Sequence, residues 1–171
     1  MYGAVKQNNG FINVYSEPGH GTVFKVYLPR ASEAFPGALT SLQQKPAHGD
    51  ETLLMVEDER AILEVGKAIL EQYGYTVLAA PTPTQALDLA AQHDGPIHVL
   101  ITDVVMPEMN GKDLNEQIMA LRPGIKTLYM SGYTANVIAH RGVIDEGINF
   151  LQKPFSIHTL AAKVREVLDQ P

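Results

Sequence analysis

Acidic residues follow two apolar runs of the sequence, at the points where the runs stop. Glu57 and Asp58 come directly after the run at 52–56, and Asp103 lies two positions beyond the run at 98–101. Both runs have the length and aliphatic content of buried strands. Ligands bind at the carboxyl ends of strands in open α/β sheets, so these carboxylates are candidates for chemistry, although Asp is also a common turn residue.

Two adjacent parallel strands would bring Glu57, Asp58 and Asp103 into one cleft. Three carboxylates in one cleft repel one another and shift their pKa values unless a cation neutralises them. An all-oxygen site with few protein ligands suits Mg²⁺. The pattern therefore predicts a magnesium site, while Asp58 taken alone could serve only as the N-cap of the following helix.

The chain from residue 51 onward alternates strand signals with helix signals. Expected N-caps are Thr82, followed by a first-turn proline, and Ser156, and a weaker helix is expected around 135–141. Such alternation implies a parallel sheet covered by helices on both faces, with right-handed crossovers. The strands are expected at 52–56, 75–79, 98–101, 125–130 and 149–152.

Composition excludes several function classes. A formal charge of -6, from 13 Lys and Arg against 19 Asp and Glu, argues against a nucleic-acid surface. There is no cysteine, which excludes disulfides and zinc–thiolate sites and fits a reducing cytoplasm. No apolar stretch approaches the roughly 20 residues of a membrane span. We therefore expect a soluble, cytoplasmic chain that makes no membrane contact.

Residues 1–30 predict a short helix and a β-hairpin, and residues 31–50 predict a linker. Alternation in the hairpin puts Ile12 and Val14 on one face, with Phe24, Val26 and Leu28 available to pack beside them. Two strands alone are marginal in water, so the hairpin needs a partner surface. We expect a homodimer through this hairpin, because a strand edge is best satisfied by another strand.

Four motifs in order resemble the receiver (response-regulator) domains of two-component signalling. They are VEDE at 56–59, TDVVMPEMNG at 102–111, MSG at 130–132 and the Lys-Pro of FLQKPF at 150–155. The resemblance covers Glu51 to about Asp169. It implies a flavodoxin-like (βα)5 fold with a five-stranded parallel sheet of order 2-1-3-4-5. It also implies a cis peptide between Lys153 and Pro154.

By this resemblance Asp103 accepts a phosphoryl group from a phosphohistidine. The donor would be the phosphotransfer domain of a histidine kinase or a histidine phosphotransfer protein. Asp58, Glu57 and the backbone carbonyl of Val105 would hold Mg²⁺ together with Asp103. The family often has Asp at the first acidic position, where Glu57 is one methylene longer.

Three further residues match functional positions of the family. Lys153 would bind one phosphoryl oxygen and the Ser131 hydroxyl another, and Ser131 and Phe150 would form the switch. Taken alone, Lys153 would be a solvated turn charge, Ser131 a small turn residue and Phe150 a packed strand aromatic. As an exposed lysine contributes little to stability, we expect Lys153 to matter more to the phosphorylated state than to the fold.

The string YGAVKQNNGFINVYSEPGHGTVFKVYLPR at 2–30 resembles the end of a histidine-kinase ATP-binding domain. The order of segments matches that of a hybrid sensor histidine kinase: a kinase fragment (1–30), a linker (31–50) and a receiver (51–171). The nucleotide-binding elements of that family are missing from this chain, so we expect no ATP binding. The receiver itself would catalyse phosphoryl transfer and hydrolysis.

Other function classes remain as alternatives. Asp-nucleophile phosphatases also place a Mg-assisted Asp after a strand, but their second Asp falls at Val105 here. A non-catalytic interaction module that regulates a kinase is the second alternative. Such a module would not need an acceptor, an acid pair, a hydroxyl and a lysine together.

Overall fold

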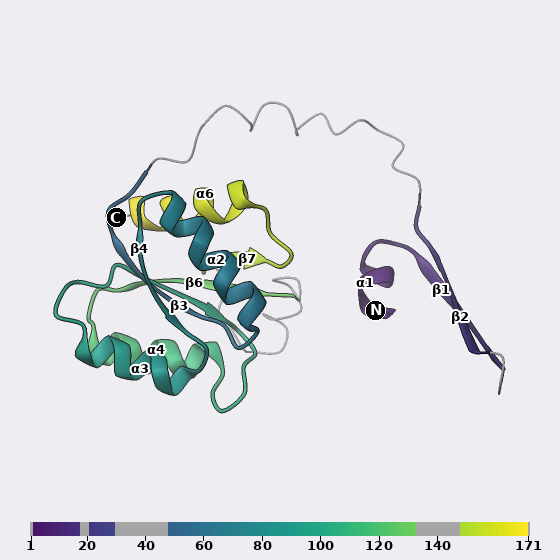
Figure 1. Cartoon of the computed structure of the whole chain (residues 1–171), viewed down its shortest axis with the longest axis horizontal. Helices are drawn as coiled ribbons and strands as arrows, with labels where there is room; N and C mark the ends of the chain where they lie inside the picture. Colours follow the sequence, from purple (N-terminus) through teal and green to yellow (C-terminus); the bar gives the residue numbers. More distant parts are fainter. Residues whose placement is uncertain (1, 18–20, 30–47, 133–147, 171) are drawn as a thin grey trace. The chain divides into compact units, whose positions relative to one another are not determined.

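The computed structural model of the chain describes residues 2–17, 21–29, 48–132 and 148–170 (Figure 1). The chain divides into two compact units, at residues 1–43 and 44–171. The helix expected around 135–141 lies outside the described residues. Within the described parts, no helix is both long enough and apolar enough to cross a bilayer.

The first unit contains α1 (Tyr2–Gln7) and an antiparallel hairpin of β1 (Phe11–Glu17) and β2 (Gly21–Tyr27). Ile12 pairs with Val26 and Val14 pairs with Phe24, which confirms the predicted apolar face. Val14 and Phe24 are 57% and 56% exposed. This apolar face is therefore open to solvent in the single chain.

The second unit is built on a five-stranded parallel sheet of order β4-β3-β5-β6-β7. In chain order this is second, first, third, fourth, fifth, so the predicted strand order is confirmed. The first and third strands of the unit lie side by side at the centre. The bounds are β3 (Thr52–Val56), β4 (Thr76–Ala80), β5 (Val99–Asp103), β6 (Lys126–Ser131) and β7 (Phe150–Gln152).

Helices cover both faces of this sheet (Figure 1). One face packs α2 (Arg60–Gln72) and α6 (Ile157–Asp169) over Met55 and Ile101, and the other packs α3 (Pro83–Gln92) and α4 (Gly111–Leu121) over Leu54 and Leu100. Neighbouring residues of a strand point to opposite faces, so each central strand feeds both cores. This explains why its sequence is apolar without alternation.

Two helix starts confirm the predicted caps. The Thr82 side chain accepts a hydrogen bond from the Gln85 amide, and Pro83 follows it in the first turn. The Ser156 side chain accepts from the Thr159 amide while the Thr159 hydroxyl accepts from the Ser156 amide, which forms a capping box.

A short strap, residues 48–51, joins the base of the sheet to the end of α2. The Gly49 amide donates to the Tyr73 carbonyl at 3.0 Å, and the His48 ring lies 5.8 Å from the Tyr73 ring. A Cβ on Gly49 would fall 2.2 Å from Cε1 of the buried Tyr75. Only glycine fits this passage, so the chain is held closely against the domain before β3 begins.

Candidate functional site

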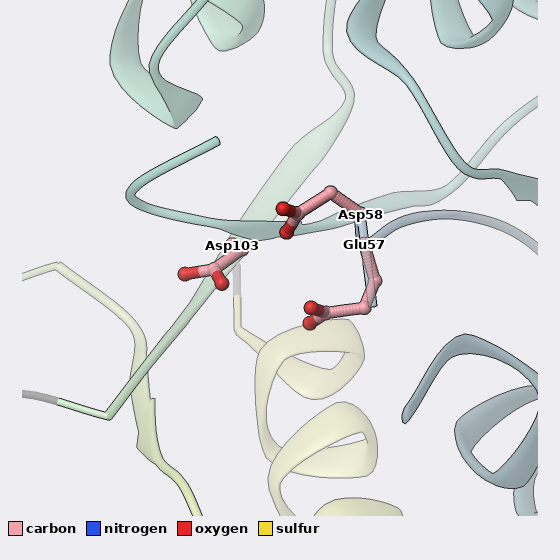
Figure 2. Close-up of side chains that lie close together, drawn as sticks. All are labelled: Glu57, Asp58 and Asp103. Atoms are coloured by element: carbon pink, nitrogen blue, oxygen red, sulfur yellow. The ribbon is translucent and has the colours of Figure 1, made fainter. Parts of the chain in front are cut away.

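The carboxyl ends of β3 and β5 bring three acidic side chains together. β3 and β5 are neighbours, with Val56 beside Thr102, so Glu57 and Asp58 emerge next to Asp103. One carboxylate oxygen from each acid lies within 4.8 Å of the others, and Figure 2 shows the three groups converging. The predicted convergence is confirmed.

The three acids differ in burial. Glu57 is 1% exposed, Asp103 is half-buried and Asp58 is exposed. The Glu57 Oε1 atom accepts a hydrogen bond from the Glu59 amide at 3.3 Å, a contact that sequence reasoning did not predict. The N-cap of α2 is Glu59, so the alternative interpretation of Asp58 as the N-cap is wrong. The exposed Asp58 carboxylate is left accessible to a ligand from solvent.

Lys153 joins two of these acids. Its ammonium donates to Asp103 Oδ2 at 2.7 Å and also to Glu57 Oε2, and its side chain is only 12% exposed. The interpretation of Lys153 as a solvated turn charge is therefore wrong, and so is our premise that the lysine is exposed. Its backbone amide donates to the Ser131 carbonyl at 2.8 Å, which extends the pairing of β7 with β6 past the last strand residue. The Lys153–Pro154 peptide is cis, as the resemblance implies.

The environment perturbs the protonation of both buried partners. Burial raises the pKa of the Glu57 carboxyl, and the nearby Asp103 charge adds to this, against the opposing pull of Lys153. Burial alone would lower the pKa of Lys153, but its hydrogen bonds to Asp103 and Glu57 outweigh burial and raise it. Lys153 is therefore charged at neutral pH and is the cation built into this acidic cluster.

The backbone after Asp103 is held by several hydrogen bonds. The Val104 amide donates to the Met130 carbonyl at 3.0 Å, and the Val105 amide donates to Asp103 Oδ1 at 3.3 Å. Sequence analysis did not single out Thr102, which is fully buried and donates its hydroxyl to the Asp103 carbonyl at 3.0 Å. The available signal was a hydroxyl at the end of an otherwise apolar strand.

Ser131 lies on β6, the strand next to that of Asp103, and Phe150 lies on β7, one strand further out. Ser131 is the last residue of β6 and is 1% exposed, and Met130 before it pairs with Asp103. Phe150 begins β7, pairs with Tyr129 and packs against the small apolar cluster that Val104 and Tyr129 form. The predicted switch aromatic therefore packs against a cluster that includes the residue after Asp103.

A separate groove of about 550 Å³ lies at the opposite end of the sheet. It is lined mainly by residues that precede β5 and β6 or begin β6, among them His98, Arg122 and Lys126. None of the residues predicted for the site lines it. The chemistry suggested by the sequence is confined to the carboxyl edge of the sheet.

The chain belongs to the family of response regulator receiver domains, whose pattern matches residues 53–165. The fold and the acidic cluster at the carboxyl edge agree with this membership.

Two curated relatives extend the comparison. Sensor kinase CckA of Brucella abortus (strain 2308) is 38% identical over 178 residues, which cover 99% of this chain and 19% of that protein. The DNA-binding transcriptional regulator NtrC of Azospirillum brasilense is 31% identical over 118 residues, which cover 69% of this chain and 24% of that protein. The chain thus spans only a fifth to a quarter of these two relatives. The match to CckA includes the N-terminal hairpin, whereas the match to NtrC is shorter.

Two solved structures share the receiver fold. The receiver domain from the hybrid histidine kinase CckA is 34% identical with a TM-score of 0.59, covering 69% of this chain and 99% of that chain. A CheY-like receiver domain from Methanospirillum hungatei JF-1 is 31% identical with a TM-score of 0.59, covering 71% of this chain and 95% of that chain.

Proposed function

We propose that this chain is the phosphoacceptor receiver of a two-component phosphorelay, with Asp103 as the acceptor. The observation that carries the proposal is the contact between the Lys153 ammonium and Asp103 Oδ2 at 2.7 Å, inside a cluster of three carboxylates. A lysine held there sits beside the place where a phosphoryl group on Asp103 would carry its negative charge. Membership of the receiver family supports the same role.

The reaction would be an in-line transfer from a phosphohistidine. An Asp103 oxygen attacks phosphorus, the P–O bond forms, and the electron pair of the P–N bond leaves with the imidazole nitrogen. Lys153 stabilises one phosphoryl oxygen by a charge-assisted hydrogen bond, and the Ser131 hydroxyl donates to another. The protein contributes mainly positioning and charge, as phosphoryl transfer requires.

The donor set fits a magnesium ion. Glu57, Asp58 and Asp103 offer only carboxylate oxygens, which hard cations prefer, and we propose the Val105 carbonyl as a further ligand. With all three carboxyls ionised, Lys153 leaves an excess of two negative charges, which a divalent cation balances. When bound, the ion would neutralise the charge of the incoming phosphoryl group.

The wider protein is proposed to be a hybrid sensor histidine kinase. The similarity to Sensor kinase CckA over 99% of this chain supports this, since it spans the hairpin as well as the receiver. The phosphodonor would be a phosphohistidine on a kinase phosphotransfer domain or on a histidine phosphotransfer protein. The ATP-dependent step would belong to parts of the protein beyond the sequence motifs found in this chain.

Phe150 is the proposed reporter of phosphorylation. Ser131 and Tyr129 lie on β6, and Phe150 lies on the neighbouring strand β7. A movement of Ser131 toward the phosphoryl group would therefore allow Tyr129 and Phe150 to repack. The packing of Phe150 against the cluster that contains Val104, the residue after the proposed acceptor, supports this role.

Phosphorylation of purified full chain tests the proposal. With Mg²⁺ and a small acyl phosphate, wild type should gain one phosphoryl group by intact-protein mass spectrometry, and Asp103→Asn should gain none. Asp88→Asn, which changes an exposed acid on α3, is the matched control and should be labelled like wild type. Equal labelling of Asp103→Asn and wild type would refute Asp103 as the acceptor, and no labelling of wild type would favour the interaction-module alternative.

A further inference from the structure

We infer that Thr102 and Gly111 are positioning residues for the acceptor: together they fix the backbone of residues 103–105, which carries the Asp103 carboxylate and the Val105 carbonyl. The inference rests on the proposed function of Asp103. It adds two residues that touch neither the phosphoryl group nor the metal and act only through that backbone.

Thr102 holds the Asp103 carbonyl from the strand side. It is fully buried in the centre of the sheet, between Val56 on β3 and Tyr129 on β6, where a valine would pack equally well. Its hydroxyl instead donates to the Asp103 carbonyl oxygen at 3.0 Å. Burying a hydroxyl is unfavourable unless it is hydrogen-bonded, so this contact accounts for a polar residue in an apolar strand.

Gly111 approaches the same carbonyl from the helix side. It is the first residue of α4, and a Cβ there would lie 2.3 Å from the Asp103 carbonyl oxygen and 3.3 Å from Thr102 Cγ2. The nearer atom is backbone and cannot move aside as a flexible side chain would. The Gly111 amide also donates to the Val104 carbonyl at 3.0 Å. The start of α4 is thus packed directly onto the backbone of the acceptor.

These contacts act on one short segment. The Asp103 carbonyl is held by Thr102, the Val104 carbonyl by Gly111, and the Val104 amide by Met130 of β6. A shift of this segment moves the nucleophile and the proposed Val105 ligand together. Because a misplacement of about 1 Å can slow a positioned reaction by about 100-fold, small displacements here have measurable effects.

The test compares Thr102→Val, Thr102→Ser and Thr127→Val in the full chain. Thr102→Val keeps the shape and removes the hydroxyl, while Thr102→Ser keeps the hydroxyl and so should restore function. Thr127→Val removes a different hydroxyl from the neighbouring strand, one that donates to Asn115 Oδ1 at 2.6 Å, and serves as the matched control for a lost hydrogen bond.

Two measurements follow each variant: Mg²⁺ binding by calorimetry without any phosphodonor, and the rate of labelling by a small acyl phosphate. We expect Thr102→Val to weaken Mg²⁺ binding and to slow labelling about tenfold each, as supporting partners of metal ligands commonly do. Thr102→Ser and Thr127→Val should stay within about twofold of wild type in both, a change too small to indicate a lost supporting contact. Urea unfolding shows whether Thr102→Val and Thr127→Val lose comparable stability.

Gly111→Ala is an independent test of the inference, because its added Cβ would clash with the same Asp103 carbonyl from the side of α4. It should also weaken Mg²⁺ binding about tenfold if it remains folded. Wild-type Mg²⁺ affinity and labelling rate in folded Thr102→Val would overturn the inference even if Gly111→Ala fails to fold. Normal Mg²⁺ binding by wild type without any labelling refutes the proposed function alone, and the calorimetric comparison still decides the positioning roles.

Discussion

Lys153, directly after the last strand of the sheet, donates to the carboxylate of Glu57, which follows the first strand of that sheet 96 residues earlier in the chain. The same ammonium donates to Asp103. One cation therefore serves two buried or half-buried acids, and it joins the two ends of the receiver fold at its functional edge. The stability of the resting domain and the proposed chemistry of its site thus involve the same three groups.

Removing the lysine charge should destabilise the metal-free domain. In Lys153→Met, Glu57 and Asp103 lose their shared cation while remaining close together, and breaking a buried pair in this way costs about 3 kcal/mol. Urea unfolding in a chelator measures the loss. Saturating Mg²⁺ should restore more stability to Lys153→Met than it adds to wild type. A variant as stable as wild type in the chelator would show that the ion pairs contribute nothing to the resting fold.

Removing the buried acid should have the opposite effect on stability. Burial and the Asp103 charge raise the pKa of Glu57, so the folded state disfavours its ionised form. Glu57→Gln should therefore raise the metal-free free energy of unfolding at pH 7 by roughly 0.5–2 kcal/mol, the range common for single stabilising substitutions. The same variant should bind Mg²⁺ about tenfold more weakly. Lower stability with unchanged Mg²⁺ binding would contradict this account of the cluster.

A second ion pair, between Glu51 and Arg165, should determine how the free energy of unfolding falls at acidic pH. Burial alone would raise the pKa of Glu51, but its hydrogen bond to Arg165 at 2.9 Å and the charge of that residue outweigh burial and lower it below 4.5. A lowered carboxyl pKa contributes stability above the unfolded value, and this is lost as pH falls through the folded value.

Glu51→Gln tests this linkage. At pH 7 the variant should be about 1 kcal/mol less stable than wild type, and the difference should shrink as the pH falls below 4.5, because wild-type Glu51 then becomes neutral too. Asp169→Asn, which alters the exposed second partner of Arg165, is the control and should have a smaller effect. A difference that does not change with pH would point to packing instead of charge.

The hairpin should drive self-association of the full chain. Val14 and Phe24 form a cross-strand pair on the solvent-open apolar face, and burying each such side chain is worth roughly 1.5–3 kcal/mol. Light scattering should detect dimers that the double change Val14→Lys and Phe24→Lys abolishes. Tyr15→Lys with Val23→Lys, the paired positions on the opposite face, is the matched control. Monomeric wild-type chain would refute the association.

The sequence predicted those parts of the fold that periodicity and end signals encode. Apolar runs gave the five strands, and Thr82 and Ser156 marked helix starts by the hydrogen bonds that their side chains make. The convergence of the acids followed from parallel pairing. The burial of Lys153 was not predicted, because a lysine after a strand is solvated unless the fold places carboxylates around it. Likewise, no local pattern shows that the Thr102 hydroxyl turns to its neighbour's carbonyl.

The strap at residues 48–51 and the acidic cluster lie at opposite ends of the receiver's sheet. Gly49 lies against the Tyr75 ring shortly before β3, and the five residues of β3 then lead away from it to Glu57. At about 3.3 Å per residue, the point of covalent attachment and the carboxylates are separated by roughly 17 Å, the full height of the sheet. The preceding chain therefore joins the domain at the amino end of β3, and the acidic cluster lies at the opposite, carboxyl end of the sheet. Under the proposed function, a phosphodonor that docks over Asp103 would approach the end of the domain opposite this attachment segment.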